Sequence, residues 1–329
     1  MTPSNFKACI LGVGTYIPKK VLTNADLEKF VDTTDEWIQS RTGIKERRVV
    51  EKDQATSDLA YEAGVVALRD AKISPKELDL IIVATISPDM YFPSTACLVQ
   101  ARLGATCPAF DLSAACSGFP YSLALATHLI SSGFYRNILV IGAEVISGLI
   151  DWSDRSTCVL FGDGAGATVV GRSTDGSGIL STYLGADGNH WDLLQIPAGG
   201  SRLPATQATI ENKMHTLKMS GAEVFKLAIR YMGEAATKAL ELANLTIDDI
   251  SLFIPHQANL RIIDALAKRL NIPMEKIFLN LQKYGNMSAA STAVALVEAV
   301  QEGRIKKGDK ILVVAFGAGL TWGSCVIQW

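Results

Sequence analysis

Apolar and polar positions change along the chain between a helical and a strand pattern, and this alternation predicts an α/β fold. Residues 57–71 and 224–243 carry apolar side chains at helical spacing. After each helix come a Ser or Thr cap, acidic residues and a short apolar strand, LIIVA at 80–84 and LFI at 252–254. Strands that are apolar without alternation are buried on both faces, so we expect helices to cover both faces of the sheet.

A second pair of segments shows the same order of elements in both halves of the chain. SAAC at 113–116 opens a helix that ends near Gly133, and the strand NILVIGAE follows. SAAS at 288–291 opens a similar helix that ends near Gly303, and the strand KILVVAFGAG follows. The agreement at several points indicates a diverged internal repeat, with two copies of one helix–strand–helix–strand unit.

The expected junction between the copies is the Gly- and Ser-rich segment 171–179, which divides the chain into residues 1–175 and 176–329. Two such lobes would enclose a cleft, and clefts between lobes are preferred ligand sites. Equivalent loops of both copies should converge there. The repeat pairs Cys116 with Ser291, so only the first copy would carry a nucleophile.

The composition of the chain indicates a globular protein and argues against nucleic-acid binding, membrane insertion and the common zinc sites. The chain has 329 residues, of which 48% are hydrophobic and 19% charged, so it can bury a large core. A formal net charge of −2 gives no global field for nucleic acid or an anionic membrane. The six cysteines form no CxxC pair, which excludes the common zinc and redox spacings and favours a reducing compartment. Without a signal-peptide layout or an apolar run of roughly 18 residues, we expect a soluble cytoplasmic protein.

Cys116 is the candidate nucleophile, because it follows the expected strand PAFDL and begins a helix. The free N–H groups and positive dipole end of a helix N-terminus favour the thiolate over the thiol. Its neighbours are small enough for a substrate to approach: Ala114, Ala115, Ser117 and Gly118. The alternative is a buried structural cysteine, which suits the cysteines in apolar stretches: Cys9, Cys97, Cys158 and Cys325.

Two further residues are candidates because of the loops that carry them. His256 directly follows the strand LFI, and α/β proteins bind ligands at the carboxyl ends of strands. Asn286 lies in the glycine-flanked turn YGNMSAAS, where a simple turn residue is the alternative. The repeat places this turn opposite the Cys116 loop, which favours a role in the site. The remaining histidines lack such a setting and are interpreted as structural or exposed: His128, His190 and His215.

Two glycine-rich segments, 161–167 and 316–323, lack the Walker lysine and the dinucleotide-binding context. Close approach of the backbone to a substrate explains them better. The second segment follows the strand KILVVA, so it either supplies oxyanion-hole amides or is an ordinary tight turn. Basic residues after His256 form either a solvated helix face or a docking patch, together with one lysine upstream: Arg261, Lys268, Arg269 and Lys226.

Seven motifs occur in the order of a known family: DEWIQSRTGIKERR, FPSTAC, AFDLSAACSGF, FGDGAGA, IPHQANLRII, YGNMSAAS and FGAGLTWGS. Over nearly its whole length the chain resembles the β-ketoacyl-acyl-carrier-protein synthase III family, which initiates bacterial type II fatty acid synthesis. The resemblance implies a thiolase fold with five layers, α-β-α-β-α, built from two similar halves. It also implies a homodimer, with the nucleophile in residues 1–175 and the His and Asn in residues 176–329.

The resemblance further implies a decarboxylative Claisen condensation between a short acyl-CoA, expected to be acetyl-CoA, and malonyl-acyl-carrier protein. Cys116 would be acylated, and His256 and Asn286 would stabilise the enolate formed as CO₂ leaves. The amides of Cys116 and Gly319 would form the oxyanion hole. Coenzyme A enters as a thioester substrate. Because decarboxylation generates the carbanion, the resemblance implies no metal and no other cofactor.

The same resemblance assigns the binding residues. Those for CoA are Trp37, Arg41, Arg155, Gly221, Asn259 and Arg261. Phe92 would close the acyl pocket from across the dimer, which suits a short primer. The acyl-carrier protein would dock on Lys226, Arg261, Lys268 and Arg269. The chain departs from the usual family residues at Ala222, Met287, Ala318 and Leu320.

Three alternatives stay open at this point. A related condensing enzyme of quinolone or polyketide metabolism would use the same chemistry with a different primer. A non-catalytic module would bind CoA or a carrier protein on the same fold. A nucleotide-binding oxidoreductase would use the glycine-rich loops, although neither loop has the required context.

Overall fold

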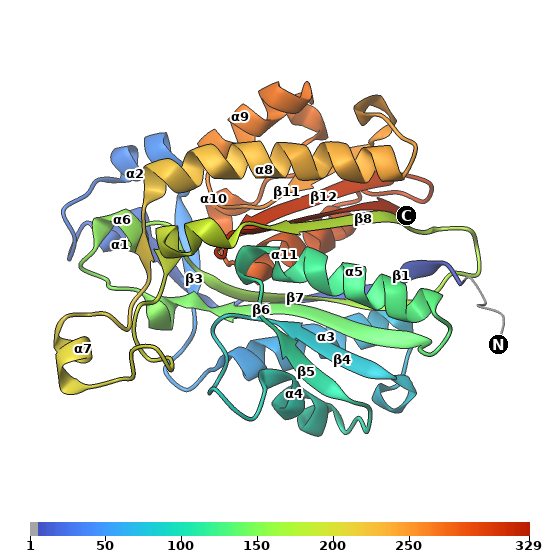
Figure 1. Ribbon diagram of the computed structural model, residues 1–329, viewed down its shortest axis with the longest axis horizontal. Coiled ribbons are helices and arrows are strands. Elements are labelled where there is room, and N and C mark those ends of the chain that lie inside the picture. The colour runs from blue at the N-terminus through green and yellow to red at the C-terminus, as the bar shows by residue number, and fades with distance from the viewer. Residues whose placement is uncertain (1–5) are drawn as a thin grey trace.

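A computed structural model describes residues 6–329, and its strands form two central sheets (Figure 1). The first sheet has five strands in the order β1 (Ala8–Tyr16), β7 (Asp163–Arg172), β6 (Asn137–Val145), β4 (Leu80–Ala84) and β5 (Ala109–Leu112). The second has four in the order β11 (Leu252–Pro255), β12 (Lys310–Gly317), β13 (Thr321–Gln328) and β8 (Gly178–Ala186). All strands of the first sheet therefore lie within residues 1–175, and all strands of the second lie within residues 176–329. β7 ends and β8 begins inside the expected junction at 171–179.

Helices cover both sheets and fill the space between them. The outer helices on the first sheet are α3 (Thr56–Ala71) and α4 (Thr95–Leu103). Those on the second are α8 (Gly221–Leu242) and α9 (Leu260–Leu270). Between the sheets lie α5 (Gly118–Ser131) and α11 (Ala289–Gln301), which gives the five layers α-β-α-β-α (Figure 1). The fold class expected from the sequence, a thiolase fold, is confirmed by this arrangement and by the solved structures compared below.

Smaller elements frame one end of this core. β2 (Lys20–Thr23) and β3 (Glu46–Val49) form an antiparallel pair, and the segment that connects them contains α1 (Asn24–Leu27) and α2 (Asp35–Thr42). The others are α6 (Arg155–Cys158), β9 (Leu194–Gln195), α7 (Gln207–Glu211), β10 (Lys218–Met219) and α10 (Leu281–Tyr284). Short 3-10 segments are η1 (Pro75–Glu77), η2 (Ala115–Ser117), η3 (Ile146–Leu149), η4 (Gly188–Leu193), η5 (Ile247–Asp249) and η6 (Met274–Lys276). No helix within residues 6–329 combines the length and apolar character needed to cross a membrane.

The internal repeat is visible in the strand order. The order β1-β7-β6-β4 of the first sheet matches β8-β13-β12-β11 of the second. The position of β5 is reduced in the second half to an isolated bridge between Phe253 and Ile277. Each copy also has the expected capped turn before its buried strand, with a capping box at Ser74 and another at Thr246.

The repeat register predicted around Cys116 is wrong by two positions. In both halves the central helix follows a non-glycine residue with positive φ, Ala115 at +46° and Ser288 at +47°. Cys116 and Ala289 are the residues directly after these turns, so backbone geometry pairs Cys116 with Ala289 and not with Ser291. The similar letters SAAC and SAAS hide this offset, because the helix begins at different points of the two motifs.

Candidate active site

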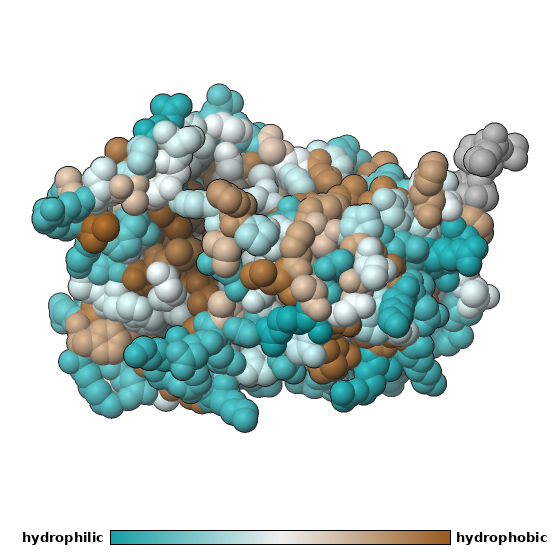
Figure 2. Space-filling view, turned by 90° about the horizontal axis from the view of Figure 1, so that it is seen from below, coloured by the Kyte–Doolittle hydropathy of each residue, from teal (hydrophilic) through white to brown (hydrophobic). Residues whose placement is uncertain are grey.

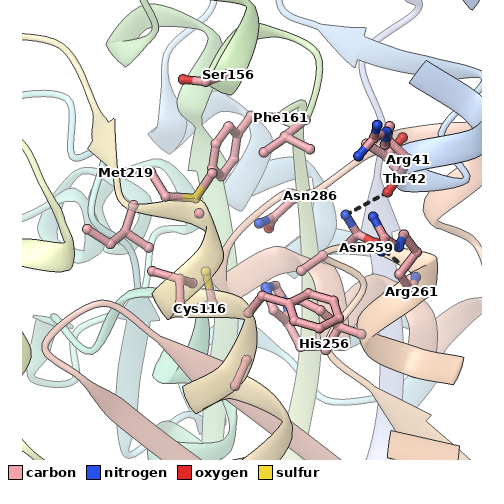
Figure 3. A pocket seen from close by; sticks show the side chains of 18 of the residues that line it. Arg41, Thr42, Cys116, Ser156, Phe161, Met219, His256, Asn259, Arg261 and Asn286 are labelled. Atoms are coloured by element: carbon pink, nitrogen blue, oxygen red, sulfur yellow. Dashed lines mark hydrogen bonds between the residues drawn. The ribbon is translucent and has the colours of Figure 1, made fainter. Parts of the chain in front are cut away.

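One cavity of about 620 Å³ contains the three residues predicted to be catalytic, and residues from both halves of the chain line it (Figure 3). Cys116 comes from η2 at the start of α5, and His256 directly follows β11. Asn286 lies between α10 and α11. Their side chains face the same space in Figure 3. The structure thus brings the loops of the two copies together, as the repeat predicts.

The backbone around Cys116 is tightly constrained. Ala115 adopts a positive φ, a conformation that is uncommon for residues other than glycine and marks many functional turns. Gly317 lies against this turn, and a Cβ at that position would be 2.7 Å from the Cys116 nitrogen. Gly317 lines the cavity, whereas Gly319, which the resemblance assigns to the oxyanion hole, does not. The loop that we expected beside the nucleophile is therefore present, and Gly317 is its residue in contact with Cys116.

The electrostatics of Cys116 differ from the sequence-based expectation of a thiolate. Only 5% of the residue is exposed. Burial raises the pKa of the thiol to about 12, although hydrogen bonding from Ser288 and Asn286 acts in the opposite direction. Burial is the largest influence on this pKa, and it favours the thiol over the thiolate.

His256 is a neutral imidazole in this cavity. The residue is buried, and burial lowers the pKa of the ring to about 3. Neither ring nitrogen has a hydrogen-bond partner among residues 6–329. A neutral imidazole carries one N–H, so His256 offers a hydrogen-bond donor to a ligand without bringing a positive charge.

Asn286 is oriented by the turn that follows it. Its Oδ1 accepts a hydrogen bond of 2.8 Å from the backbone N–H of Ser288. Because the carbonyl oxygen is engaged in this way, the Nδ2 group remains available as a donor. His256 and Asn286 therefore both present N–H groups, an arrangement suited to an oxygen atom that gains negative charge.

The six residues predicted to bind CoA all line the same cavity: Trp37, Arg41, Arg155, Gly221, Asn259 and Arg261. The Arg155 guanidinium lies 4.9 Å from the centre of the Trp37 ring, close enough for a cation–π contact. Asn259 caps α9 by accepting from the Arg261 N–H at 2.8 Å, and its Nδ2 donates to the Arg41 carbonyl at 3.1 Å (Figure 3). These contacts join α2 to α9 and bring two arginines to one side of the cavity.

Comparisons with known proteins show the family of this chain. Family models described as 3-oxoacyl-[acyl-carrier-protein (ACP)] synthase III and its C-terminal part match residues 110–188 and 240–329. A curated relative from Caldanaerobacter subterraneus, a β-ketoacyl-[acyl-carrier-protein] synthase III, is 61% identical, and the match covers 98% of both chains. The chain belongs to the β-ketoacyl-acyl-carrier-protein synthase III family. It is thus a condensing acyltransferase of fatty acid synthesis with a thiolase fold.

Solved structures extend the comparison. The chain is similar to 3-oxoacyl-[acyl-carrier-protein] synthase III from Aquifex aeolicus VF5, with a TM-score of 0.91 and 54% identity, covering 98% of this chain and 100% of that one. It is also similar to the priming β-ketosynthase from the R1128 polyketide biosynthetic pathway, with a TM-score of 0.91 and 36% identity. That match covers 100% of this chain and 98% of the other. Similar structures thus include an enzyme of fatty acid synthesis and one of a polyketide pathway, so the identity of the acyl primer has to be inferred from the site.

Two groups of predicted residues lie partly or wholly outside the cavity. Phe92, expected in the acyl pocket, is 85% exposed and does not line the cavity of its own chain. Of the expected docking residues, Lys226 and Arg261 line the cavity. Lys268 and Arg269 lie further along α9 and are exposed. The long side chain of Arg269 passes over Gly233 of α8, so α8 and α9 together carry the four cations.

The sequence analysis missed two polar residues next to Cys116. Glu144 ends the strand NILVIGAE, and Ser288 follows Asn286 in the turn already considered. An acid at the end of a buried apolar strand is a signal that was available in the sequence.

Within residues 6–329 no group of three or more His, Cys, Asp or Glu side chains is placed to hold a metal.

The rate of alkylation of Cys116 should rise with pH up to the thiol pKa, because only the thiolate reacts and burial raises that pKa to about 12. Below that pKa, the thiolate fraction increases about tenfold per pH unit. Iodoacetamide labelling from about pH 6 to about pH 10, followed by peptide mass spectrometry, measures this rate at Cys116. The exposed Cys97 in the same digest reports loss of reagent. A plateau at Cys116 below about pH 8 would contradict the effect of burial.

Proposed function

We propose that the protein condenses acetyl-CoA with malonyl-acyl-carrier protein and releases CoA, CO₂ and a 3-oxoacyl-acyl-carrier protein, as the first condensation of type II fatty acid synthesis. The observation that carries this proposal is the single cavity with Cys116, His256 and Asn286 at one part and the Trp37–Arg155 pair at another. A substrate with a reactive thioester at the end of a long arm fits such a cavity. The aromatic ring and the cations suit the nucleotide end of CoA.

In the first half-reaction the Cys116 sulfur attacks the acetyl-CoA carbonyl. The bond from the carbonyl carbon to the CoA sulfur breaks, and an acetyl-enzyme remains. The amide of Cys116 and an amide of the turn 317–319 would hold the oxyanion. The contact between Gly317 and the Cys116 nitrogen supports this arrangement. The expected Gly319 amide stays the proposed second donor.

In the second half-reaction the malonyl thioester oxygen accepts hydrogen bonds from His256 and Asn286. These bonds strengthen as CO₂ leaves and negative charge develops on that oxygen. The resulting carbanion attacks the acetyl group and displaces the Cys116 sulfur. Loss of CO₂ supplies the carbanion, so the proposal invokes no metal or organic cofactor. The neutral state of His256 suits this role, because the imidazole keeps its N–H without competing for a proton.

A second subunit would complete the acyl pocket. The segments before α4 and along β5 expose several large apolar side chains: Met90, Tyr91, Phe92 and Phe110. Figure 2 views the molecule from the side of α4 and β5 and shows hydrophobic residues spread across this face. Large exposed apolar areas mark interaction sites. We therefore propose a cytoplasmic homodimer in which Phe92 enters the partner's cavity and limits the primer to a short acyl group.

A different primer is the second candidate function. Similarity to the R1128 priming β-ketosynthase favours it, because the same fold then serves a polyketide pathway. The catalytic residues would keep their roles in that case. The two functions differ in the acyl group that the pocket accepts.

The two half-reactions should separate by mutation. Cys116→Ala should abolish the gain of one acetyl group on incubation with acetyl-CoA but retain decarboxylation of malonyl-acyl-carrier protein. His256→Ala and Asn286→Ala should retain acetylation and lose about 10²- to 10³-fold in decarboxylation, because each removes one donor to the oxyanion. Intact-protein mass spectrometry and release of labelled CO₂ measure the two steps. Decarboxylation unchanged in both of the latter variants would instead favour a non-catalytic binding module.

Primer choice should depend on Phe92. The wild-type protein should prefer acetyl-CoA in a panel of acyl-CoA primers, and Phe92→Ala should improve turnover of longer primers by about 10-fold or more, since a pocket discriminates by roughly this factor per methylene. Phe134→Ala is the matched control, because that phenyl ring is 86% exposed on another part of the chain. A wild-type preference for long or aromatic primers would support the polyketide-type alternative. A Phe92→Ala variant that keeps the wild-type preference among primers would show that Phe92 does not line the acyl pocket.

Carrier-protein docking should depend on the cations of α8 and α9. Lys268→Glu should raise KM for malonyl-acyl-carrier protein by about 3- to 10-fold and leave KM for malonyl-CoA unchanged, because only the protein substrate reaches this surface. Lys238→Glu is the control on α8, where the lysine pairs with Glu241 at 2.6 Å. Steady-state kinetics at two ionic strengths measure the effect. Equal changes with both substrates would exclude a docking role.

A further inference from the structure

A fully buried arginine lies behind the end of the cavity that is proposed to bind CoA. Arg47 of β3 has 0% exposure and is among the largest side chains that are completely covered. Its hydrogen bonds within residues 6–329 go to neutral oxygen atoms, and the adjacent acid Glu46 pairs with Arg48 at 2.8 Å. A buried charge without hydrogen bonds is strongly unfavourable, so these acceptors are held in place relative to the guanidinium.

The guanidinium connects segments that are distant in the sequence. Its Nη2 donates to the Val159 carbonyl at 2.7 Å, and Val159 directly follows α6. Its Nη1 donates to Asn24 Oδ1 at 2.8 Å and to the Leu22 carbonyl at 3.3 Å. Arg47 thereby joins the end of α6 to the start of α1, and one of these bonds spans 112 positions of the chain.

Asn24 continues the connection to α2. Its Nδ2 group donates to Asp35 Oδ1 and to the Ile44 carbonyl, each at 2.8 Å. Asp35 is the first residue of α2, and Ile44 follows the residue that caps its C-terminus. Asn24 is 1% exposed, so water does not compete for these bonds. A single buried amide therefore holds both ends of this helix.

The two helices joined in this way carry the side chains proposed to bind the nucleotide end of CoA. Trp37 and Arg41 lie on α2, Arg155 opens α6, and all three line the cavity. Figure 1 shows α1, α2 and α6 together at one end of the molecule. On the exposed side, Arg155 donates to the Asp32 carbonyl at 2.9 Å, a bond that water can replace. The buried hydrogen bonds are therefore the lasting connection between the two helices.

We propose that Arg47 is a positioning residue for the nucleotide end of acyl-CoA. Through the buried hydrogen bonds it fixes the separation of α6 and α2, and with it the gap between Trp37 and Arg155. Arg47 acts through these residues, since it does not itself line the cavity. An arginine suits the position because its planar group holds donors in fixed directions, whereas a lysine is a single point charge. The inference rests on the proposed function, which assigns the nucleotide to the Trp37–Arg155 pair.

The catalytic Asn286 is held by other contacts. Its N–H donates to the Leu160 carbonyl at 2.8 Å, and its carbonyl accepts from the Gly162 N–H at 3.0 Å. Arg47 only packs against this segment, where a Cβ at Gly162 would lie 3.1 Å from the Arg47 Cβ. A substitution that keeps the volume of the arginine but removes its hydrogen bonds should therefore weaken nucleotide binding and spare the chemistry.

Two thioesters separate nucleotide binding from chemistry. Acetyl-CoA and acetyl-pantetheine carry the same reactive group on the same arm, but acetyl-pantetheine lacks the nucleotide. In Arg47→Met the acetyl-CoA concentration at half-maximal rate of Cys116 acetylation should rise about 10-fold, as for loss of one cation–π contact, and the maximal rate should stay within about twofold. Acetylation by acetyl-pantetheine and decarboxylation of malonyl-acyl-carrier protein should also stay within about twofold. Rapid quench with intact-protein mass spectrometry measures acetylation.

A milder variant and a matched control accompany this test. Arg47→Lys keeps the charge but loses the fixed donor directions, so the same concentration should rise about 3- to 5-fold, and this variant decides if Arg47→Met does not fold. Arg172→Met is the control. Arg172 at the end of β7 is half-buried, donates to the Gly133 carbonyl at 2.7 Å and does not line the cavity. Its replacement should leave the values for both thioesters within about twofold of wild type.

The outcomes separate a positioning role from general stability and from failure of the proposed function. Equal changes with acetyl-CoA and acetyl-pantetheine would overturn the inference, because Arg47 would then act on the fold as a whole. Wild-type values for both thioesters in the Arg47 variants would overturn it as well. A wild-type protein that is acetylated equally well by both thioesters would refute the assignment of the nucleotide to the Trp37–Arg155 pair. A wild-type protein acetylated by neither would refute the proposed function, and this inference with it.

Discussion

The active site depends on the close approach of the starts of two helices, α5 and α11, to the backbone of the strands beside them. α11 lies on the first sheet where glycines replace side chains: a Cβ at Gly142 would be 2.5 Å from the Ala289 oxygen, and one at Gly166 would be 2.6 Å from the Ala293 carbonyl carbon. On the second sheet Gly317 has the same effect beneath Cys116. At these contacts the backbone of the helix start meets the backbone of the strand, and backbone cannot move aside to admit a side chain as a flexible side chain could. The loops that precede α5 and α11 are therefore held against each other, and they form the inner wall of the cavity.

This packing also determines the charge state of the site. The groups beside the sulfur are covered on all sides, so burial dominates their titration. The thiol and the imidazole are neutral in the resting structure, and the buried carboxylate of Glu144 is satisfied by hydroxyl and amide donors. In such surroundings hydrogen bonds to a developing oxyanion are stronger than in water. Such a site stabilises the negative charge that develops on a substrate oxygen during the reaction, while the side chains of Cys116 and His256 carry no charge beforehand.

The repeat explains how one fold supplies unlike partners to a single reaction. The same strained turn precedes the central helix in both halves, at Ala115 and at Ser288. In the first half the residue after the turn is the nucleophile Cys116, and in the second it is Ala289, whose N–H faces Glu144. Divergence of two equivalent turns therefore placed a sulfur on one side and hydrogen-bonding groups on the other. The cleft between the halves brings them together.

Local patterns in the sequence determined the α/β class, the two copies of the unit, and the residues that reach the cavity. Apolar strands, capped turns and glycine-flanked loops are short-range features, and the carboxyl ends of parallel strands meet at one edge of a sheet, so Cys116, His256 and Asn286 could be selected from them. The residues that line the CoA end followed from resemblance, since no local pattern distinguishes them. The tertiary structure alone decided the neutral thiol, the contact of Gly317 with Cys116, the pairing of Cys116 with Ala289, and the place of Glu144. Each of these depends on burial or on contacts between distant segments, such as the 145 positions between Glu144 and Ala289, and neither burial depth nor helix register can be read from a local pattern.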